Sequence, residues 1–288
     1  MKTSLNRALV AAIILAATTY FVGYGQQKQG ANGAYAEVNG LKMYYEIHGA
    51  GQPLVLLHGA FGFNESWATV LPALIKAHQV IAIELQGHGH TNDLDRPLTY
   101  EQMAEDTAAL LNQLKIKNAD FFGYSMGGTV ALGVAIRHPE LVRKLAIYGS
   151  CAGKPKDVYD PESYKQYQSI SADFAPPALK EPYDRMAPDP KRWPVLVTKI
   201  KNMGRDFNGY SAAELKAIKA QTLIMMGDRD AVRPEHAVEM YRLIPNAQLA
   251  IFPGGDHFLL FSGPDRVLAA LAPFLDAPMP EPKKTGNE

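Results

Sequence analysis

A serine stands between two glycines in the run Gly123-Tyr124-Ser125-Met126-Gly127, and this spacing is typical of an activated nucleophile. Apolar residues 121–122 precede the run and an apolar helical stretch, 129–136, follows it, which predicts a strand, a sharp turn and a helix. The glycines avoid a Cβ collision where the chain reverses direction. The pattern predicts that Ser125 is a nucleophile held on a strained turn.

A serine hydroxyl needs a base to take its proton and an acid to orient that base. Of the eight histidines, His257 fits best, because it follows the last expected strand and a glycine-rich turn. Asp228 and Asp230 both follow the penultimate expected strand, and either carboxylate could reach the imidazole from that loop. The chain order serine, aspartate, histidine is the order that accompanies this serine motif, so the predicted chemistry is acyl transfer.

Backbone N–H groups must also meet the negative charge that develops on a substrate carbonyl oxygen. Met126 supplies one such group as the residue after the nucleophile. The second is expected in the glycine-containing loop 58–62, which follows an apolar strand. Ala60 is the first choice for this donor and Phe61 is the second.

The elements that position these residues follow from the hydrophobic pattern. Short apolar or β-rich runs alternate with stretches of helical spacing, which predicts a mostly parallel sheet buried on both faces. The expected strands are Tyr35–Val38, Leu41–His48, Leu54–Leu57, Val80–Leu85, Phe121–Phe122, Leu145–Tyr148, Thr222–Met226 and Gln248–Phe252. Asn39-Gly40 predicts a hairpin turn between the first two strands, and Thr99 with Gln102 predicts a capping box before a helix.

The segment 151–210 interrupts this alternation and is rich in proline and tyrosine. It is too long for a simple crossover. It is expected to form a helical lid after the sixth strand, where it gates access and selects the acyl group. The alternative is a surface excursion without substrate contact. The core then comprises 35–150 and 211–278, followed by a C-terminal tail, 279–288.

The first 34 residues, 1–34, are not expected to belong to the fold. Lys2 and Arg7 precede an apolar run that leads into a polar, glycine-rich stretch, which predicts an export signal plus linker, cleaved downstream of Val22. The protein is then periplasmic or secreted. Alternatively 8–24 is an uncleaved membrane anchor, since about 17 apolar residues can just span a bilayer.

Composition limits the partners of this 288-residue chain. The 29 basic and 29 acidic residues cancel, so no net field favours nucleic acid or an anionic membrane surface. The single cysteine, Cys151, excludes an intrachain disulfide, and no cysteine–histidine spacing suggests structural zinc. The expected partner is a small ester or lactone, with membrane attachment only through the N-terminal segment and with no cofactor or metal.

Between about Tyr35 and Asp276 the chain resembles the α/β-hydrolases. The motifs that carry the resemblance are His58-Gly59, Gln86-Gly87-His88-Gly89, Gly123-Tyr124-Ser125-Met126-Gly127-Gly128, Gly227-Asp228-Arg229-Asp230 and Gly255-Asp256-His257. The resemblance implies an α/β-hydrolase fold, with a mostly parallel eight-stranded sheet and helices on both faces. In members with a Gly-Asp-x-Asp loop the catalytic acid is usually the second aspartate, which favours Asp230 over Asp228.

The most similar group comprises cofactor-free haloperoxidases, esterases and enol-lactonases, which implies a serine hydrolase that cleaves a small ester or lactone through an acyl-serine. Carbon–carbon bond hydrolysis, peracid formation and a ligand-binding receptor with a vestigial triad remain alternatives. Glu84 stands where the family commonly has aspartate, and His90-Thr91 replaces a usual Arg-Ser pair, so the substrate stays open. A metal site formed by His88, His90, Asp93 and Asp95 is disfavoured, because the family uses this loop structurally.

Overall fold

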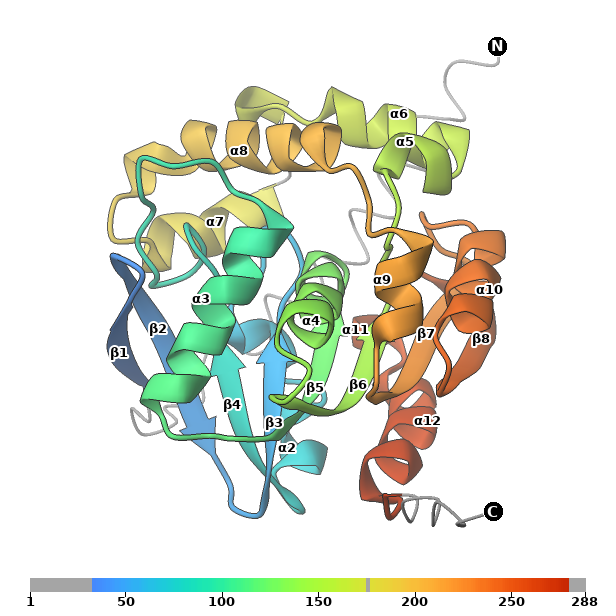
Figure 1. Ribbon diagram of the computed structural model, residues 1–288. Helices are drawn as coiled ribbons and strands as arrows, with labels where there is room; N and C mark the ends of the chain where they lie inside the picture. Colours follow the sequence, from blue (N-terminus) through green and yellow to red (C-terminus); the bar gives the residue numbers. More distant parts are fainter. Residues whose placement is uncertain (1–32, 175–176, 280–288) are drawn as a thin grey trace, which may run out of the picture.

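The computed structural model describes residues 33–174 and 177–279, and these contain one eight-stranded sheet in the order β1-β2-β4-β3-β5-β6-β7-β8 (Figure 1). The strands are β1 (Gly33–Val38), β2 (Leu41–His48), β3 (Gln52–Leu57), β4 (His78–Ile83), β5 (Ala119–Tyr124), β6 (Val142–Tyr148), β7 (Gln221–Arg229) and β8 (Ala247–Asp256). Only the β1–β2 and β2–β4 pairs are antiparallel. The predicted sheet is confirmed, with β1 starting at Gly33, two residues earlier than expected.

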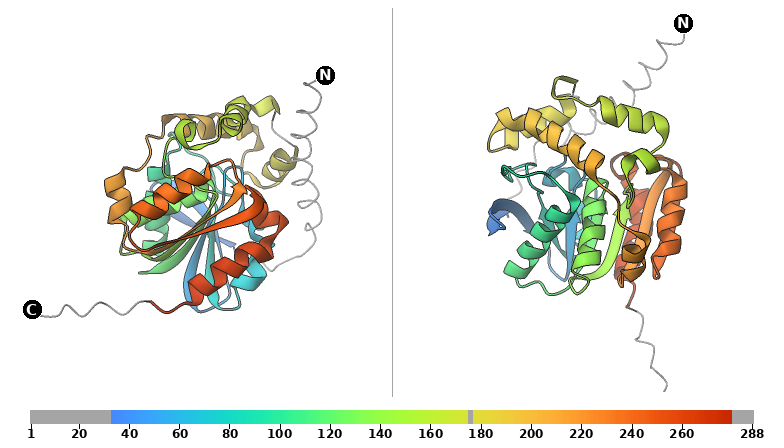
Figure 2. Two further views of the ribbon diagram at one scale, coloured as in Figure 1. Left: turned by 90° about the vertical axis from the view of Figure 1, so that its right-hand side faces the viewer. Right: turned by 45° about the horizontal axis from the view of Figure 1, so that its top comes forward.

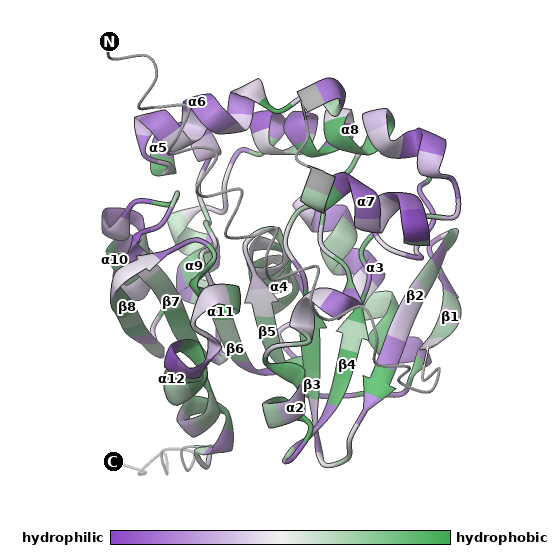
Figure 3. Ribbon diagram, turned by 180° about the vertical axis from the view of Figure 1, so that it is seen from behind, coloured by the Kyte–Doolittle hydropathy of each residue, from purple (hydrophilic) through white to green (hydrophobic). Residues whose placement is uncertain are grey.

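Helices cover both faces of the sheet, as predicted (Figures 1, 2 and 3). One face carries α3 (Tyr100–Gln113), α4 (Met126–Arg137), α9 (Ala212–Ala217) and α10 (Pro234–Leu243). The other carries η1 (Asn64–Trp67), α2 (Leu71–Leu74), α11 (Leu259–Ser262) and α12 (Pro264–Asp276). Parallel strands joined by helices in this way bring the loops after the strands to one edge of the sheet.

Alternate residues of each central strand serve two separate cores. In β3, Val55 and Leu57 pack with α3 and α4, whereas Leu54 and Leu56 pack on the opposite face with Trp67. All four β3 side chains are fully buried, and burying such a side chain stabilises the fold by about 1.5–3 kcal/mol. Burial on both faces explains why the strand is a continuous apolar run rather than an alternating one.

Helix α3 begins with half of the predicted capping box. The Thr99 side chain accepts a hydrogen bond from the Gln102 backbone N–H at 3.0 Å. The reciprocal bond is not formed, because the Gln102 side-chain amide donates to Asp106 at 3.0 Å instead. Asp106 is a fully buried carboxylate that also pairs with Arg96, and a charged acceptor binds the amide more strongly than a capping geometry would.

The segment between β6 and α9, which we call the insertion (151–210), is helical in the described residues. It contains α5 (Pro155–Val158), α6 (Pro161–Ser169), η2 (Ala172–Phe174), α7 (Pro177–Met186), η3 (Pro190–Arg192) and α8 (Trp193–Asp206). The Tyr210 N–H donates to the Ala152 carbonyl at 2.7 Å, so the two ends of the insertion meet at a narrow neck. Its helices lie beyond the carboxyl ends of the parallel strands, where a lid would have to be (Figure 1). Its action as a lid stays a prediction.

The predicted export signal or anchor and nearly all of the predicted tail lie outside the described residues. Within 33–174 and 177–279, no helix combines the length and the apolar character needed to cross a membrane.

Candidate active site

Ser125 lies on a sharp turn between the end of β5 and the start of α4. Its φ of 53° and ψ of −119° are values that a residue with a side chain rarely adopts. A Cβ on Gly127 would lie 2.0 Å from the Leu57 carbonyl oxygen, and one on Gly123 would lie 2.5 Å from the Gly128 Cα. The two glycines therefore permit the strained turn that the sequence predicts, and the serine is left partly exposed.

Three predicted site residues lie in one chain of hydrogen-bond contacts. His257 Nε2 is 3.0 Å from Ser125 Oγ, and His257 Nδ1 is 2.8 Å from Asp230 Oδ1. With Nδ1 protonated, the imidazole donates to the carboxylate and accepts from the serine hydroxyl. Asp228, the other predicted acid, is exposed, whereas the Asp230 side chain is fully buried. The structure thus brings Asp230, and not Asp228, to the imidazole.

The loop that carries Asp230 is supported by the insertion. The Val232 backbone N–H donates to Asp230 Oδ1 at 3.1 Å and thereby fixes the carboxylate. Val232 also pairs with Tyr159 in an isolated antiparallel bridge, and the Asp160 N–H donates to the Ala231 carbonyl at 3.0 Å. The start of the insertion therefore holds the acid loop in place.

The environment of His257 includes two tyrosines that sequence reasoning did not identify. The Tyr124 hydroxyl donates to the His257 carbonyl at 3.1 Å, and the Tyr148 hydroxyl donates to the Asp256 carbonyl at 2.7 Å. The Tyr124 ring lies 5.2 Å from the imidazole. Tyr124 precedes the nucleophile in the serine motif, but no spacing indicates its contact with a loop far away in the sequence.

Two opposing influences set the pKa of His257. Burial lowers it, because the imidazolium is less well solvated than in water. The charge of Asp230, the hydrogen bond to that carboxylate and the charge of Asp256 outweigh burial, so the pKa is raised above the ordinary 6.5. An imidazole with a raised pKa is a stronger proton acceptor, which suits a general base.

The loop 58–62 lies against the nucleophile. The Gly62 N–H donates to the Gly59 carbonyl at 3.0 Å, and a Cβ on Gly59 would lie 3.2 Å from the Ser125 Cβ. In the described part of the chain, the backbone N–H groups of Ala60 and Phe61 have no hydrogen-bond acceptor. Met126 is the first residue of α4, where backbone N–H groups have no acceptor within the helix. The choice of Ala60 and Met126 as oxyanion donors stays a prediction.

His58 anchors this loop to the end of β4. Its Nδ1 lies 2.8 Å from the Gly59 carbonyl oxygen, and the Leu85 N–H donates to its Nε2 at 3.1 Å. Both bonds together require a neutral ring with the proton on Nδ1. Burial, assisted by the neighbouring His88, lowers the pKa of His58 to about 3.

Glu84 and the pair His90-Thr91, the two departures from the family pattern, contact one another. One of its carboxylate oxygens accepts from the Asn64 N–H at 3.0 Å, and the other accepts from the His90 N–H at 2.5 Å. The same oxygen lies 3.1 Å from His90 Nδ1, and this hydrogen bond raises the pKa of His90 above its ordinary value. The Thr91 hydroxyl donates to the Glu84 carbonyl at 2.7 Å. Glu84, His90 and Thr91 thus form one linked set.

His88 and Asp93, two residues of the disfavoured metal site, contact other partners. His88 Nδ1 lies 2.9 Å from the Gln86 carbonyl oxygen, and Asp93 pairs with Arg192 and Lys199. Over the ranges that the structure describes, no group of histidine, cysteine, aspartate and glutamate side chains is arranged to hold a metal ion.

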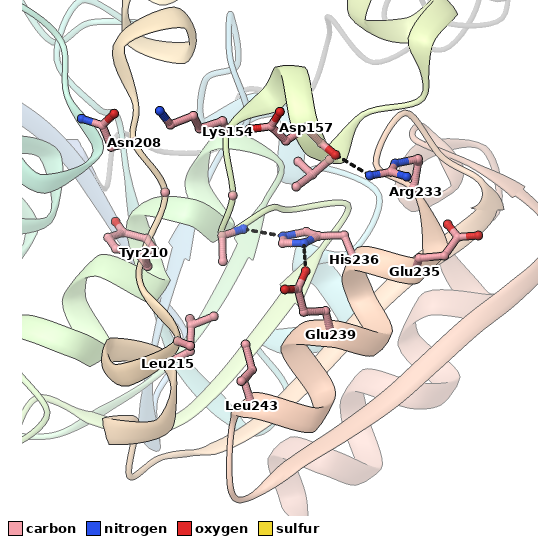
Figure 4. A pocket seen from close by; sticks show the side chains of 15 residues that line it. Lys154, Asp157, Asn208, Tyr210, Leu215, Arg233, Glu235, His236, Glu239 and Leu243 are labelled. Carbon is pink, nitrogen blue, oxygen red and sulfur yellow. Dashed lines mark hydrogen bonds and ion pairs between the residues drawn. The ribbon is translucent and has the colours of Figure 1, made fainter.

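A pocket of about 380 Å³ lies beside the neck of the insertion, between α5, α9 and α10, and Ser125 does not line it (Figure 4). Within it His236 Nε2 accepts from the Ala152 N–H at 3.0 Å, and its Nδ1 lies 3.0 Å from a Glu239 carboxylate oxygen. Cys151, next to the neck, is buried, and burial raises the pKa of its thiol to about 12. These groups anchor the insertion rather than extend the serine site.

Comparison with known proteins places the chain in a family. A family model described as the alpha/beta hydrolase family matches residues 54–270. The chain is 27% identical over 272 residues to 2-hydroxymuconate semialdehyde hydrolase of Pseudomonas sp. (strain CF600), which covers 82% of this chain and 91% of that relative. It is 30% identical over 278 residues to the dihydrolipoyllysine-residue acetyltransferase component of the acetoin cleaving system of Pseudomonas putida. This match covers 88% of this chain and 72% of that relative.

Among solved structures, the enol-lactonase from Burkholderia xenovorans aligns with a TM-score of 0.68 at 24% identity, covering 85% of this chain and 100% of that one. A sheet of this order with a serine at the strand–helix turn is the architecture of a hydrolase. The chain belongs to the alpha/beta hydrolase family.

Proposed function

We propose that Ser125, His257 and Asp230 form the catalytic triad of a serine hydrolase that cleaves a small carboxylic ester or lactone. The observation that supports this most strongly is the contact chain from hydroxyl to imidazole to buried carboxylate, at 3.0 and 2.8 Å. Such an arrangement activates a hydroxyl that is otherwise a weak nucleophile at neutral pH.

In the proposed mechanism, His257 Nε2 takes the proton of Ser125 as Oγ bonds to the carbonyl carbon. The carbonyl electron pair moves to its oxygen, which the N–H groups of Met126 and Ala60 stabilise. Collapse of this tetrahedral intermediate breaks the bond to the leaving alkoxide, which receives the proton from the imidazolium. An acyl-serine remains. Water then attacks the acyl carbon, gives its proton to the imidazole, and the proton returns to Ser125 as the acid is released.

The insertion contacts the loop of the proposed oxyanion donors. Phe61 of the loop 58–62 contacts Trp193 of α8, with ring centroids 5.3 Å apart, so an aromatic wall stands beside the proposed oxyanion donors. We infer that the insertion acts as a lid whose apolar side contacts the acyl or leaving group.

Hydrolysis of a carbon–carbon bond next to a carbonyl is a second candidate, because 2-hydroxymuconate semialdehyde hydrolase is 27% identical to the chain. Such a reaction would use the same site and release a carbon acid in place of an alcohol. Assays with a vinylogous diketone and with simple esters separate the two candidates by their relative kcat/KM. Bromination in the presence of peroxide and acetate would reveal peracid chemistry.

A serine-reactive phosphonate tests the central proposal. Mass spectrometry should find one adduct on Ser125, and a short-chain nitrophenyl ester should give a burst of nitrophenol followed by steady turnover. Ser125→Ala should lose both signals. A labelled residue other than Ser125, or ligand binding without any ester turnover, would refute the hydrolase proposal and favour a receptor.

For the N-terminal segment we propose export, with the protein periplasmic or secreted, and an uncleaved anchor over 8–24 as the alternative. N-terminal sequencing of protein from fractionated cells tests this. A start downstream of Val22 in soluble material supports export, a retained segment in the membrane fraction supports the anchor, and Met1 on cytosolic protein refutes both.

A further inference from the structure

The loop 58–62 contains a backbone conformation that its own sequence disfavours. The Gly62 N–H to Gly59 carbonyl bond makes it a four-residue turn, and Phe61 at the third position has a φ of 61°. Turns with a positive φ at this position usually place glycine or asparagine there, because a bulky side chain is strained in the left-handed region. Something outside the turn must hold Phe61 in place.

The Phe61 ring packs on the insertion. Its centroid lies 5.3 Å from that of Trp193, the first residue of α8, and the Tyr183 ring lies 5.1 Å from Trp193 on the same insertion. Trp193 is only 2% exposed, and in the described residues its indole N–H has no acceptor. Packing alone therefore fixes the indole, and its position depends on where α8 lies.

Asp93 fixes α8 to the core. The Asp93 side chain is 5% exposed, and its carboxylate is 2.6 Å from Arg192 and 2.8 Å from Lys199. Arg192 immediately precedes α8, and Lys199 lies in its second turn. Lys199 Nζ also donates to the Leu94 carbonyl at 2.5 Å, and the Gln86 amide donates to Asp93 at 2.8 Å. The Asp93–Lys199 pair is the more buried of the two, and salt screens it little.

We propose that Asp93 is a positioning residue that couples closure of the insertion to the oxyanion loop. Asp93 holds α8, α8 places Trp193, and Trp193 holds Phe61 in the strained turn that aims the loop N–H groups at the reacting carbonyl. The inference rests on the proposed serine hydrolase. Its consequence is that loosening the insertion lowers kcat even for the smallest ester, whereas a lid that only admits substrate would change KM.

Asp93→Asn tests this with Asp206→Asn as the matched control, because Asp206 pairs with Arg205 on the exposed side of the same helix. For nitrophenyl acetate, Asp93→Asn should lower kcat about tenfold, the size of a typical coupling between contacting groups. Asp206→Asn should leave kcat within about twofold. Lys199→Met, which keeps Arg192, should give a smaller loss in the same direction. Equal kcat values for Asp93→Asn and Asp206→Asn would overturn the proposal.

Phe61→Gly separates positioning from a general loss of structure. Glycine adopts a positive φ without support, so Asp93→Asn should lower kcat much less in a Phe61→Gly background than in the wild-type background. If Asp93→Asn has the same effect on kcat in both backgrounds, Asp93 acts on stability alone and the proposal is wrong.

A spectroscopic readout follows the coupling directly. The chain has two tryptophans, so Trp67→Phe leaves Trp193 as the only one. In that background Asp93→Asn should shift the emission to the red and increase acrylamide quenching, because Trp193 becomes exposed. Unchanged emission and quenching would contradict the proposal. Phosphonate labelling of the wild type distinguishes the failures: no label on Ser125 refutes the hydrolase, whereas a labelled wild type with an unaffected Asp93→Asn variant refutes only the coupling.

Discussion

Two aspartates of one loop have opposite environments, which makes their roles separable. Asp230 is buried against His257, whereas Asp228 is exposed. Asp230→Asn should lower kcat for a nitrophenyl ester about 10⁴-fold, because the amide favours the wrong imidazole tautomer. Asp228→Asn should stay within about twofold of wild type, as surface substitutions usually do. Equal losses in the two variants would reassign the acid.

The oxyanion donor can be tested by removing a single N–H group. Ala60 is the second residue of the turn 59–62, a position that proline favours, so Ala60→Pro should leave the turn intact. It removes the proposed donor, and kcat should fall about 10²–10³-fold while the melting temperature stays near that of wild type. Ala60→Ser, which keeps the N–H, is the control. Full activity of Ala60→Pro would move the role to Phe61.

In the proposed mechanism, the pH dependence of kcat/KM reports the protonation of His257 in the free enzyme. Its pKa is raised above 6.5, because Asp230 and Asp256 outweigh the lowering effect of burial. For a neutral ester, kcat/KM should therefore fall on acidification with a midpoint above pH 6.5, since only the neutral imidazole accepts a proton. Asp256→Asn should move the midpoint to lower pH. A midpoint that is unchanged in this variant would show that the Asp256 charge does not act on His257.

At the scale of elements, the sequence predicts structure that depends on local patterns, but it does not predict contacts between distant residues. The strands follow from apolar runs, and the Ser125 turn follows from glycine spacing, because both depend on neighbours in the sequence. The pairing of Asp93 with Lys199 joins residues 106 positions apart, and that of Tyr124 with His257 joins residues 133 apart, so no pattern indicates them. The side chain of Gln102 has a different reason for departing from the predicted capping box: its partner Asp106 is only four positions away, but its burial, which makes it the stronger acceptor, depends on the tertiary fold.

One such distant contact fixes the end of α12. Lys144 of β6 is fully buried, and its ammonium donates to the carbonyls of Phe274, Leu275 and Ala277 at the C-terminal end of that helix. The charge also complements the negative end of the helix dipole. Lys144→Met should lower the free energy of unfolding by about 2–3 kcal/mol, because the carbonyls lose a charged donor.

Urea unfolding of Lys144→Met measures this loss, with Lys216→Met as the control. Lys216 is an exposed lysine of α9, and its replacement should change the free energy of unfolding by no more than about 0.5 kcal/mol. Similar values for the two variants would show that the helix end is stabilised without Lys144.

At the scale of the molecule, the site is assembled from both parts of the chain. The sheet edge supplies Ser125, Asp230 and His257, and the insertion supports both the acid loop, through Tyr159, and the loop 58–62, through Trp193. The two supports lie in different parts of the insertion, in its first helices and in α8. A hydrolase built this way depends on the integrity of the whole fold, including its buried titratable groups.

Three buried histidines with lowered pKa values, His58, His88 and His236, make that integrity sensitive to acid. Burial lowers the pKa of His58 to about 3 and that of His88 to about 4. Below pH 6.5 the unfolded chain binds protons at these histidines and the folded chain does not, so stability falls as the pH falls. The raised pKa values of His90 and His257 act in the opposite direction, since they favour the folded state in acid. Carboxylates change the free energy of unfolding mainly below about pH 5. Between pH 7.5 and 5.5 its pH dependence therefore reports the histidines.

Urea unfolding should show that the free energy of unfolding falls by about 1–2 kcal/mol between pH 7.5 and 5.5. His88→Gln should flatten the decline, because it removes one group that the unfolded chain protonates and the folded chain does not. His90→Gln should steepen it, because it removes a group whose raised pKa favours the folded state in acid. The opposite signs make the two variants mutual controls. Parallel curves for wild type and both variants would mean that the acid sensitivity of the free energy of unfolding arises elsewhere.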